Sequence, residues 1–176
     1  YVSADMAAHA FETLWQAGQA QGMVLCGMHM MDCCRIEKGF RHFGHDITCE
    51  DHVLEAGLGF AVKTDKPAFI GRAAVLEKRQ TGLETRLVQF KLTDPEPMLY
   101  HNEPILRDGE IVGYLSSGAY GHHLGAAIGM GYVPCKGESA AQVMASRYEI
   151  DVAGVKVGAE VSLRPMYDPT SQRVKA

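Results

Sequence analysis

Residues 26–48, CGMHMMDCCRIEKGFRHFGHDIT, hold the densest group of side chains in this chain that could perform chemistry. His29 and Cys33 lie four residues apart, a spacing that on a helix lets both side chains reach one metal ion. His42 and His45 follow and could supply two further ligands. The stretch contains no Cys-x-x-Cys or His-Glu-x-x-His pattern, so a zinc site is only weakly indicated. The competing interpretation is that the cysteines and methionines fill a core.

A catalytic thiolate is a second possibility for this stretch. Cys33 or Cys34 would need a histidine base and an electropositive setting, whereas a Cys-Cys pair inside a helix is typically buried and inert. His122 and His123 form another pair in a glycine-flanked turn. The two side chains could face a ligand, or the turn could be a solvated loop without a function. The charged residues around the first stretch could form an anion site, but they are more typical of a salt-bridged loop anchor: Arg35, Glu37, Lys38, Arg41 and Asp46.

The elements that must position these residues follow from hydrophobic spacing and from stop signals. Ser3 is a suitable N-cap for a helix over residues 4–17, and a second helix is predicted over 28–38, ended by Gly39. The next residues, FRHFGHDIT, are too polar to continue it and predict a loop. A strand is predicted within 54–64 and a short helix over 71–82.

The pattern changes at Arg86. Short runs rich in Val, Ile, Leu and Tyr recur about every ten residues, separated by Gly, Pro and Asp, which is typical of antiparallel β-structure. Asp108-Gly109 predicts a tight hairpin, because both turn positions favour positive φ. We therefore predict a mixed α/β part over residues 1–82 and a small antiparallel barrel or sandwich over 83–176.

Bulk properties narrow the function classes. The 176 residues carry a formal net charge of -4 and no basic run, so nucleic-acid binding is not expected. No apolar stretch is long enough to cross a membrane. Five cysteines without a Cys-x-x-Cys pair favour a reducing, intracellular compartment. The chain begins at Tyr1, so we expect it to be a piece of a longer protein.

Two segments, RIEKGFRHFGHDIT and LEAGLGFAVKTDKPAFIGRAAVLEKR, resemble the folate-dependent aminomethyltransferase family that includes the glycine-cleavage T-protein. The resemblance continues through GEIVGYLSSGAYG, AAIGMGYVP and LRPMYDPTSQRVKA, and so covers nearly the whole chain. The form EKGFRHFGHD, together with the closing YDPTSQRVK, is most similar to the C-terminal halves of sarcosine and dimethylglycine dehydrogenases.

The resemblance implies an α+β fold. Residues 1–82 would be the C-terminal part of a middle folate-binding subdomain, and 83–176 a β-barrel-like C-terminal subdomain. It also implies tetrahydrofolate as cofactor, FAD in an N-terminal domain of the same chain, and a small N-methyl amine substrate whose oxidised carbon is captured as 5,10-methylenetetrahydrofolate. The expected compartment is the cytoplasm, or the mitochondrial matrix in a eukaryote. A free-standing aminomethyltransferase and a non-catalytic folate-binding module are the alternatives.

The resemblance also implies site residues. Tyr1 resembles the tyrosine that closes the family's pterin-binding motif, so the catalytic aspartate and the pterin-binding glutamate are expected upstream, and no catalytic residue within this chain. Phe60 occupies a position where the family places an aromatic ring against folate; the alternative is a core aromatic on a buried strand. Arg35 matches the arginine of the family's L-R-x-E motif, either near folate or in a salt bridge to Glu37.

Two positions depart from the T-protein itself. Met31 stands where the T-protein carries a further folate-contacting arginine, and Gln172 and Arg173 stand where it carries a C-terminal tyrosine. These differences favour the dehydrogenase branch and leave the binding of the folate glutamate tail without assigned residues.

Overall fold

A computed structural model describes residues 1–175 of the chain. By internal packing the chain divides into two compact units, Tyr1–Met31 and Asp32–Ala176, the last residue lying outside the described part. The first unit contains a 3-10 helix, η1 (Ala4–Met6), and α1 (Ala7–Gln19). Ser3 precedes them in an extended conformation, but its side chain makes no capping hydrogen bond.

α2 (Met28–Glu37) forms where the sequence predicts it and ends two residues before Gly39, whose φ of 63° suits glycine. The residues that follow form no helix, as predicted for this loop. The predicted strand within 54–64 is wrong, because these residues form turns and a short 3-10 helix, η2 (Gly59–Ala61). The next predicted helix is confirmed as α3 (Arg72–Thr81).

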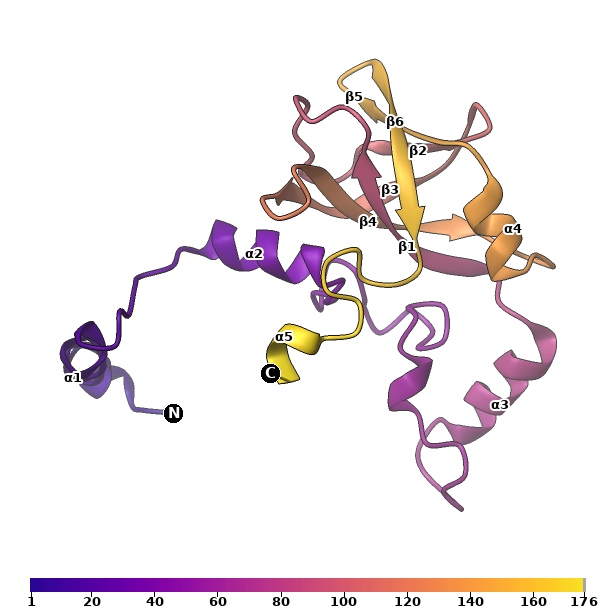
Figure 1. Ribbon diagram of the computed structural model, residues 1–176. Helices are drawn as coiled ribbons and strands as arrows, with labels where there is room; N and C mark the ends of the chain where they lie inside the picture. The colour runs from indigo at the N-terminus through magenta and orange to yellow at the C-terminus, as the bar shows by residue number, and fades with distance from the viewer. Residues whose placement is uncertain (176) are drawn as a thin grey trace. The chain divides into compact units, whose positions relative to one another are not determined.

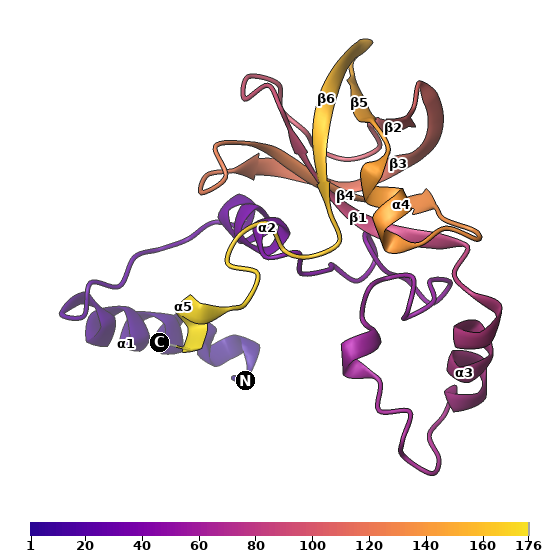
Figure 2. The same cartoon turned by 45° about the vertical axis from the view of Figure 1, so that its right-hand side comes forward.

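The β-rich part forms a closed antiparallel barrel with strand order β1-β4-β3-β2-β5-β6 (Figures 1 and 2). The predicted hairpin at Asp108-Gly109 is confirmed, since both residues have positive φ, 54° and 96°. Residues 148–152 pair with residues 155–159 in a second tight hairpin, between the last two strands. The strands are β1 (Thr85–Leu92), β2 (Pro104–Arg107), β3 (Glu110–Gly121), β4 (Ala126–Pro134), β5 (Tyr148–Val152) and β6 (Val155–Ser162).

Two short helices accompany the strands. α4 (Ala140–Ala145) begins with a capping box in which Ser139 and Gln142 satisfy each other's backbone N–H groups. The sequence analysis did not predict it, because it is only six residues long. α5 (Gln172–Lys175) ends the described chain.

The barrel has a packed interior and a second cluster on its outer face. The interior is built around Phe90 and Tyr148, whose rings meet edge to face at 5.6 Å between centroids. Outside, Ile36 from α2 is fully buried against Leu87, Ile128 and Met130. This outer cluster fixes the end of α2, and hence the loop after it, on the barrel surface.

Candidate functional site

A groove of about 500 Å³ lies where three segments of the Asp32–Ala176 unit meet. They are the loop after α2, the turn around η2 and the segment that follows β6. A volume of this size lies in the range of small-molecule sites. We call it the Phe40–Phe60 groove; its main lining side chains are Phe40, Arg41, Leu58, Phe60, Leu163 and Pro165.

Phe60 is the most exposed aromatic side chain of the groove. Its side chain sits on η2 with 80% relative exposure, and Phe40 is 60% exposed. The alternative that Phe60 is a core aromatic on a buried strand is therefore wrong. Two exposed rings beside one cavity are costly to leave in water, and they offer flat apolar surface for stacking.

Arg41 supplies positive charge to the groove wall. Its Nε donates to the Ala56 carbonyl at 2.9 Å and its Nη1 to the Gly39 carbonyl at 2.6 Å. Burial lowers the pKa of this guanidinium from its ordinary value, with Tyr132 and Asp46 acting in the opposite direction. Gly57 has a φ of 70°, and a Cβ there would lie 2.7 Å from Arg41 Nη2. Glycine at 57 thus lets the guanidinium approach the turn.

Lys38 fastens the segment after β6 that forms one wall of the groove. Its Nζ donates to the Asp168 carbonyl at 2.6 Å and to Ser171 Oγ at 3.2 Å, and it pairs with Asp168 Oδ2 at 3.3 Å. Burial acts to raise the pKa of Asp168, but the Gln172 N–H and the Lys38 ammonium outweigh it, so this pKa is lowered. The loop-anchor interpretation of Lys38 is confirmed by these contacts.

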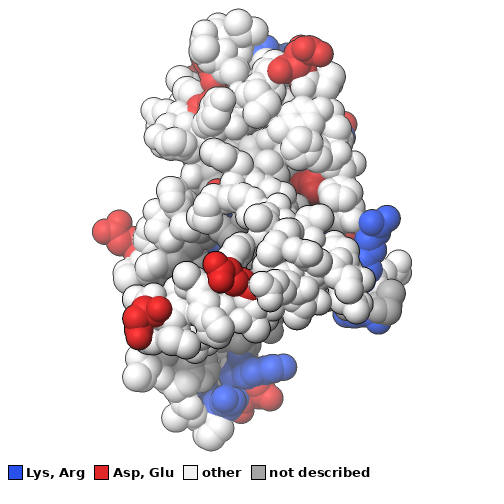
Figure 3. Space-filling view, turned by 90° about the vertical axis from the view of Figure 1, so that its left-hand side faces the viewer, with Lys and Arg blue, Asp and Glu red and all other residues white. Residues whose placement is uncertain are grey.

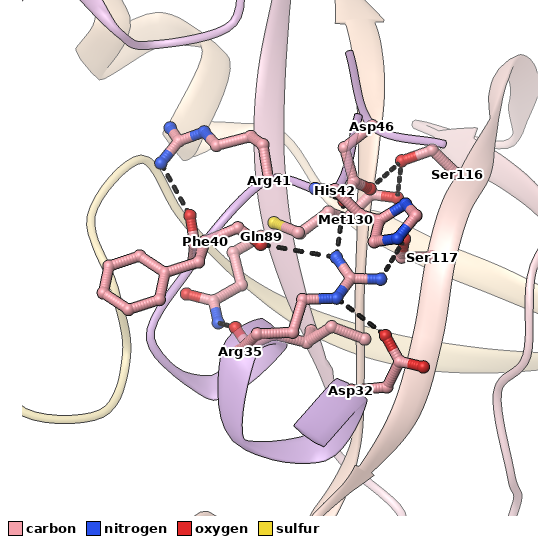
Figure 4. A network of polar contacts seen from close by, with 12 residues as sticks. Asp32, Arg35, Phe40, Arg41, His42, Asp46, Gln89, Ser116, Ser117 and Met130 are labelled. Carbon is pink, nitrogen blue, oxygen red and sulfur yellow. Dashed lines mark hydrogen bonds and ion pairs between the residues drawn. The ribbon is translucent and has the colours of Figure 1, made fainter. Parts of the chain in front are cut away.

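Arg35 lies beneath the groove loop in a network with Asp46 (Figure 4). Its Nη1 pairs with Asp46 Oδ2 at 2.5 Å, its Nε with Asp32 Oδ1 at 2.9 Å, and its Nη2 donates to Ser117 Oγ at 2.8 Å. All three guanidinium nitrogens therefore have protein partners. The expected partner Glu37 is wrong, and the geometry favours the structural alternative for Arg35.

Asp46 is the buried centre of this network, with no solvent-exposed surface. Besides Arg35 it accepts hydrogen bonds from the His42 N–H at 2.8 Å and from Ser116 Oγ at 2.5 Å. These contacts join the loop to α2 and to β3. The loop that carries Phe40 and Arg41 is thus held at both ends by charge-assisted hydrogen bonds.

Glu37 has a different partner on the barrel. Its carboxylate accepts from the His123 N–H at 2.7 Å and contacts His123 Nδ1 at 2.8 Å. The His123 ring lies 4.4 Å from the ring of Tyr167, on the segment after β6. His123 thus lies in an exposed turn, as the solvated-loop interpretation has it, with its side chain half exposed, and the buried Glu37 carboxylate anchors that turn.

The sulfur atoms mostly lie outside the core. Cys26, Cys34 and Cys49 are exposed, Cys33 packs partly against the outer barrel cluster, and only Cys135 is buried. The interpretation of the sulfurs in residues 26–48 as core filling is thus wrong apart from Cys33. Burial raises the pKa of the Cys33 thiol, which opposes a thiolate role. No group of three or more metal-binding side chains comes together within residues 1–175.

Tyr1 belongs to the Tyr1–Met31 unit, where its side chain is fully exposed. Of the expected site residues, Phe60 lines the groove, whereas Arg35 lies outside it, in the network beneath the loop that carries Phe40. Tyr1 is described only within its own unit. The sequence analysis placed Phe40 in a loop without a role and missed it as a site residue. Its position after Gly39 in a polar loop is the signal that could have identified it.

Charged side chains form no single basic patch on the face shown in Figure 3. Basic side chains there lie singly or near acidic ones, rather than in one patch. No helix in the described part of the chain has the length and apolar character needed to cross a bilayer.

Both halves of the sequence match known protein families. The GCVT N-terminal domain matches residues 1–66, and the glycine cleavage T-protein C-terminal barrel domain matches residues 85–168, which here form the barrel. The chain belongs to the glycine cleavage T-protein family. The suspected family and the α+β fold with a C-terminal barrel are confirmed.

Individual relatives come from two groups within the family. A 4-methylaminobutanoate oxidase (formaldehyde-forming) of Paenarthrobacter nicotinovorans is 40% identical over 99% of this chain and 21% of its own length. The mitochondrial sarcosine dehydrogenase of Homo sapiens is 35% identical over 94% of the chain and 18% of its own length. An aminomethyltransferase of Halothermothrix orenii is 41% identical over 76% of the chain and 37% of its own length.

Among solved structures, the glycine cleavage system aminomethyltransferase T of Bartonella henselae shares the fold with a TM-score of 0.67. It is 27% identical, and the match covers 78% of this chain and 38% of that one. The chain spans about a fifth of the length of the oxidase and dehydrogenase relatives. Related T-protein family members are enzymes.

Proposed function

We propose that this T-protein family chain is the folate-binding part of an FAD-dependent sarcosine/dimethylglycine-type dehydrogenase or oxidase. The observation that carries the proposal is the share of the chain that each relative matches. The oxidase and sarcosine dehydrogenase matches extend over 99% and 94% of the chain, against 76% for the aminomethyltransferase of Halothermothrix orenii and 88% for that of Synechocystis. In this proposal residues 1–82 complete a middle folate-binding subdomain and residues 83–176 form the C-terminal one.

The groove offers chemistry that fits a folate. Phe40 and Phe60 present exposed rings suited to a flat heteroaromatic or aminobenzoyl group. Arg41 and Arg164 line the same groove and suit the carboxylates of a glutamate tail. When bound, tetrahydrofolate supplies the amine nitrogen that accepts the one-carbon unit. The chain's own residues contribute stacking surface, positive charge and a wall that limits access of water.

The substrate we propose is a small N-methyl amine, oxidised by an FAD-containing part of the longer protein. The name of the Paenarthrobacter relative records formaldehyde as a product of that enzyme. A folate site beside the oxidising domain would divert the same carbon into 5,10-methylenetetrahydrofolate. The catalytic aspartate expected for that step lies upstream of Tyr1 in this proposal, so the chain alone is expected to be inactive.

The test uses the full-length protein with sarcosine, dimethylglycine or 4-methylaminobutanoate. We expect flavin absorbance near one equivalent per chain. We also expect tetrahydrofolate to lower the formaldehyde released per substrate oxidised while methylenetetrahydrofolate accumulates. A product and a rate that do not respond to tetrahydrofolate would overturn the proposal.

A free-standing aminomethyltransferase is the second candidate. It is favoured by the 41% identity to the Halothermothrix orenii enzyme and by the structural match to the Bartonella henselae enzyme. A colourless full-length protein that cannot be reconstituted with flavin, yet transfers an aminomethyl group to tetrahydrofolate, would favour it over the oxidase.

A further inference from the structure

A second cavity, of about 480 Å³, lies away from the Phe40–Phe60 groove, where the end of α3 meets the start of β1 and the residues after β4. Figures 1 and 2 show α3 leading directly into the first barrel strand. Three cations line this cavity together with two leucines and a thiol. We call it the α3–barrel cavity: Leu54, Lys78, Arg79, Leu83, Arg86 and Cys135.

The internal ion pairs leave the cavity with uncompensated positive charge. Lys78 Nζ is neutralised by Glu55 Oε1 at 2.9 Å. The one acid lining the cavity, Glu138, pairs with Arg107 outside it. Arg79 donates from Nη1 to the neutral Thr64 hydroxyl at 2.7 Å, and neither Arg79 nor Arg86 has an ion-pair partner within the described chain.

Arg86 lines the cavity and has an unsatisfied donor. Its Nε is buried and has no hydrogen-bond partner in the part of the chain that the structure describes, although its side chain interacts with the Cys135 thiol. Buried donors are nearly always paired, so such an atom calls for a partner. The neighbouring thiol does not provide a charge, because burial raises the pKa of Cys135 more than Arg86 lowers it.

We propose that the α3–barrel cavity binds the phosphate group of a small molecule, with Arg86 and Arg79 as its donors. Arginine presents several N–H groups in a planar fork that matches phosphate oxygens. A tetrahedral oxyanion offers enough acceptors for N–H groups of both arginines at once. Leu54 and Leu83 provide apolar surface for an organic part, and the volume exceeds what the phosphate alone needs.

Isothermal titration calorimetry with inorganic phosphate, at constant ionic strength, tests the site in the full chain. We expect saturable binding of one phosphate per chain in the unmodified protein. Arg86→Gln should weaken this binding about tenfold or more, the loss of one charge-assisted contact, and Arg79→Gln by a smaller factor. Arg147→Gln is the matched control, since Arg147 is exposed, pairs with Glu149 and lies outside the cavity.

A titration with glycerol 2-phosphate distinguishes a site for a phosphorylated small molecule from a site for free phosphate. Tighter binding than inorganic phosphate would identify a phosphorylated small molecule, and equal binding would identify free phosphate. Phe60→Ala should leave both titrations unchanged, so the result does not depend on the folate proposal. Should Arg86→Gln fail to fold, Arg79→Gln still tests the site. Absence of saturable binding, or equal affinity in the arginine variants and in Arg147→Gln, would overturn the proposal.

Discussion

Arg35 and Asp46 are joined by an ion pair of 2.5 Å between Nη1 and Oδ2, and Asp46 has no exposed surface. The pair connects α2 to the loop that carries Phe40 and Arg41. Because a buried charge is stable only with its partner, this contact fixes the position of the groove wall without touching the groove itself.

Replacing Asp46 by Asn should therefore be strongly destabilising. The substitution leaves Arg35, whose side chain is 15% exposed, without its main counter-ion. Breaking a buried pair in this way costs about 3–5 kcal/mol in the free energy of unfolding. Urea denaturation measures the loss, with Asp65→Asn on an exposed residue as the control. A loss no larger than in the control would contradict the role of the pair.

Phe60→Ala should weaken folate binding while leaving the fold intact. Offset stacking contributes about 0.5–1.5 kcal/mol beyond burial, which corresponds to a two- to tenfold rise in Kd. Stability should change little, because the ring is 80% exposed. Fluorescence titration of the full-length protein with a folate measures the affinity. Tyr114→Ala, an exposed aromatic on β3 outside the groove, is the matched control; an equal Kd in both variants would count against the groove.

Gly57→Ala should destabilise the groove turn for two reasons that a control can separate. The φ of 70° costs an alanine about 1 kcal/mol, and the new Cβ would lie 2.7 Å from Arg41 Nη2. Gly44→Ala shares the positive φ, 94°, but has open space around the added Cβ. A larger loss of unfolding free energy for position 57 than for position 44 is expected. Equal losses would show that the approach of Arg41 is unimportant.

Acid should weaken the attachment of α3 through Glu55. Burial acts to raise its pKa, but Lys78 and the N–H groups of Glu84 and Thr85 outweigh burial, so the pKa is lowered. The stabilisation is therefore complete above the unfolded-state pKa of about 4.3 and is lost as the pH falls through the lower folded-state value. Unfolding free energies measured between neutral pH and about pH 3 should fall less steeply in Glu55→Gln. Parallel pH profiles would contradict this assignment.

Thiol labelling should separate the cysteines by burial. Cys26 and Cys49 are exposed and should react rapidly with a maleimide at neutral pH. Cys135 should react slowest, because it is buried and its pKa is raised. Peptide mass spectrometry of timed samples measures each rate, and Cys135→Ala identifies the slow peptide. Fast labelling of Cys135 in the native protein would show that the α3–barrel cavity opens.

The sequence by itself determined the elements that depend on neighbouring residues. The hydrophobic spacing in 28–37 and Gly39 after it specify α2 and its end, and Asp108-Gly109 specifies the hairpin through positive φ. The recurrence of β-rich runs from Arg86 predicts an antiparallel barrel or sandwich, and the structure shows the closed barrel. The family could also be recognised from the sequence, because its motifs are contiguous in the chain.

Tertiary structure alone decided which distant residues meet. The segment around Phe60 has a strand-like composition, yet its glycines and the bonds of Arg41 to Gly39 and Ala56 make it a turn that exposes the ring. The resemblance left Glu37 open as a partner of Arg35, but closure of the barrel brings His123 to Glu37, and Arg35 pairs with Asp46. Such pairings depend on long-range packing, which a local pattern does not encode.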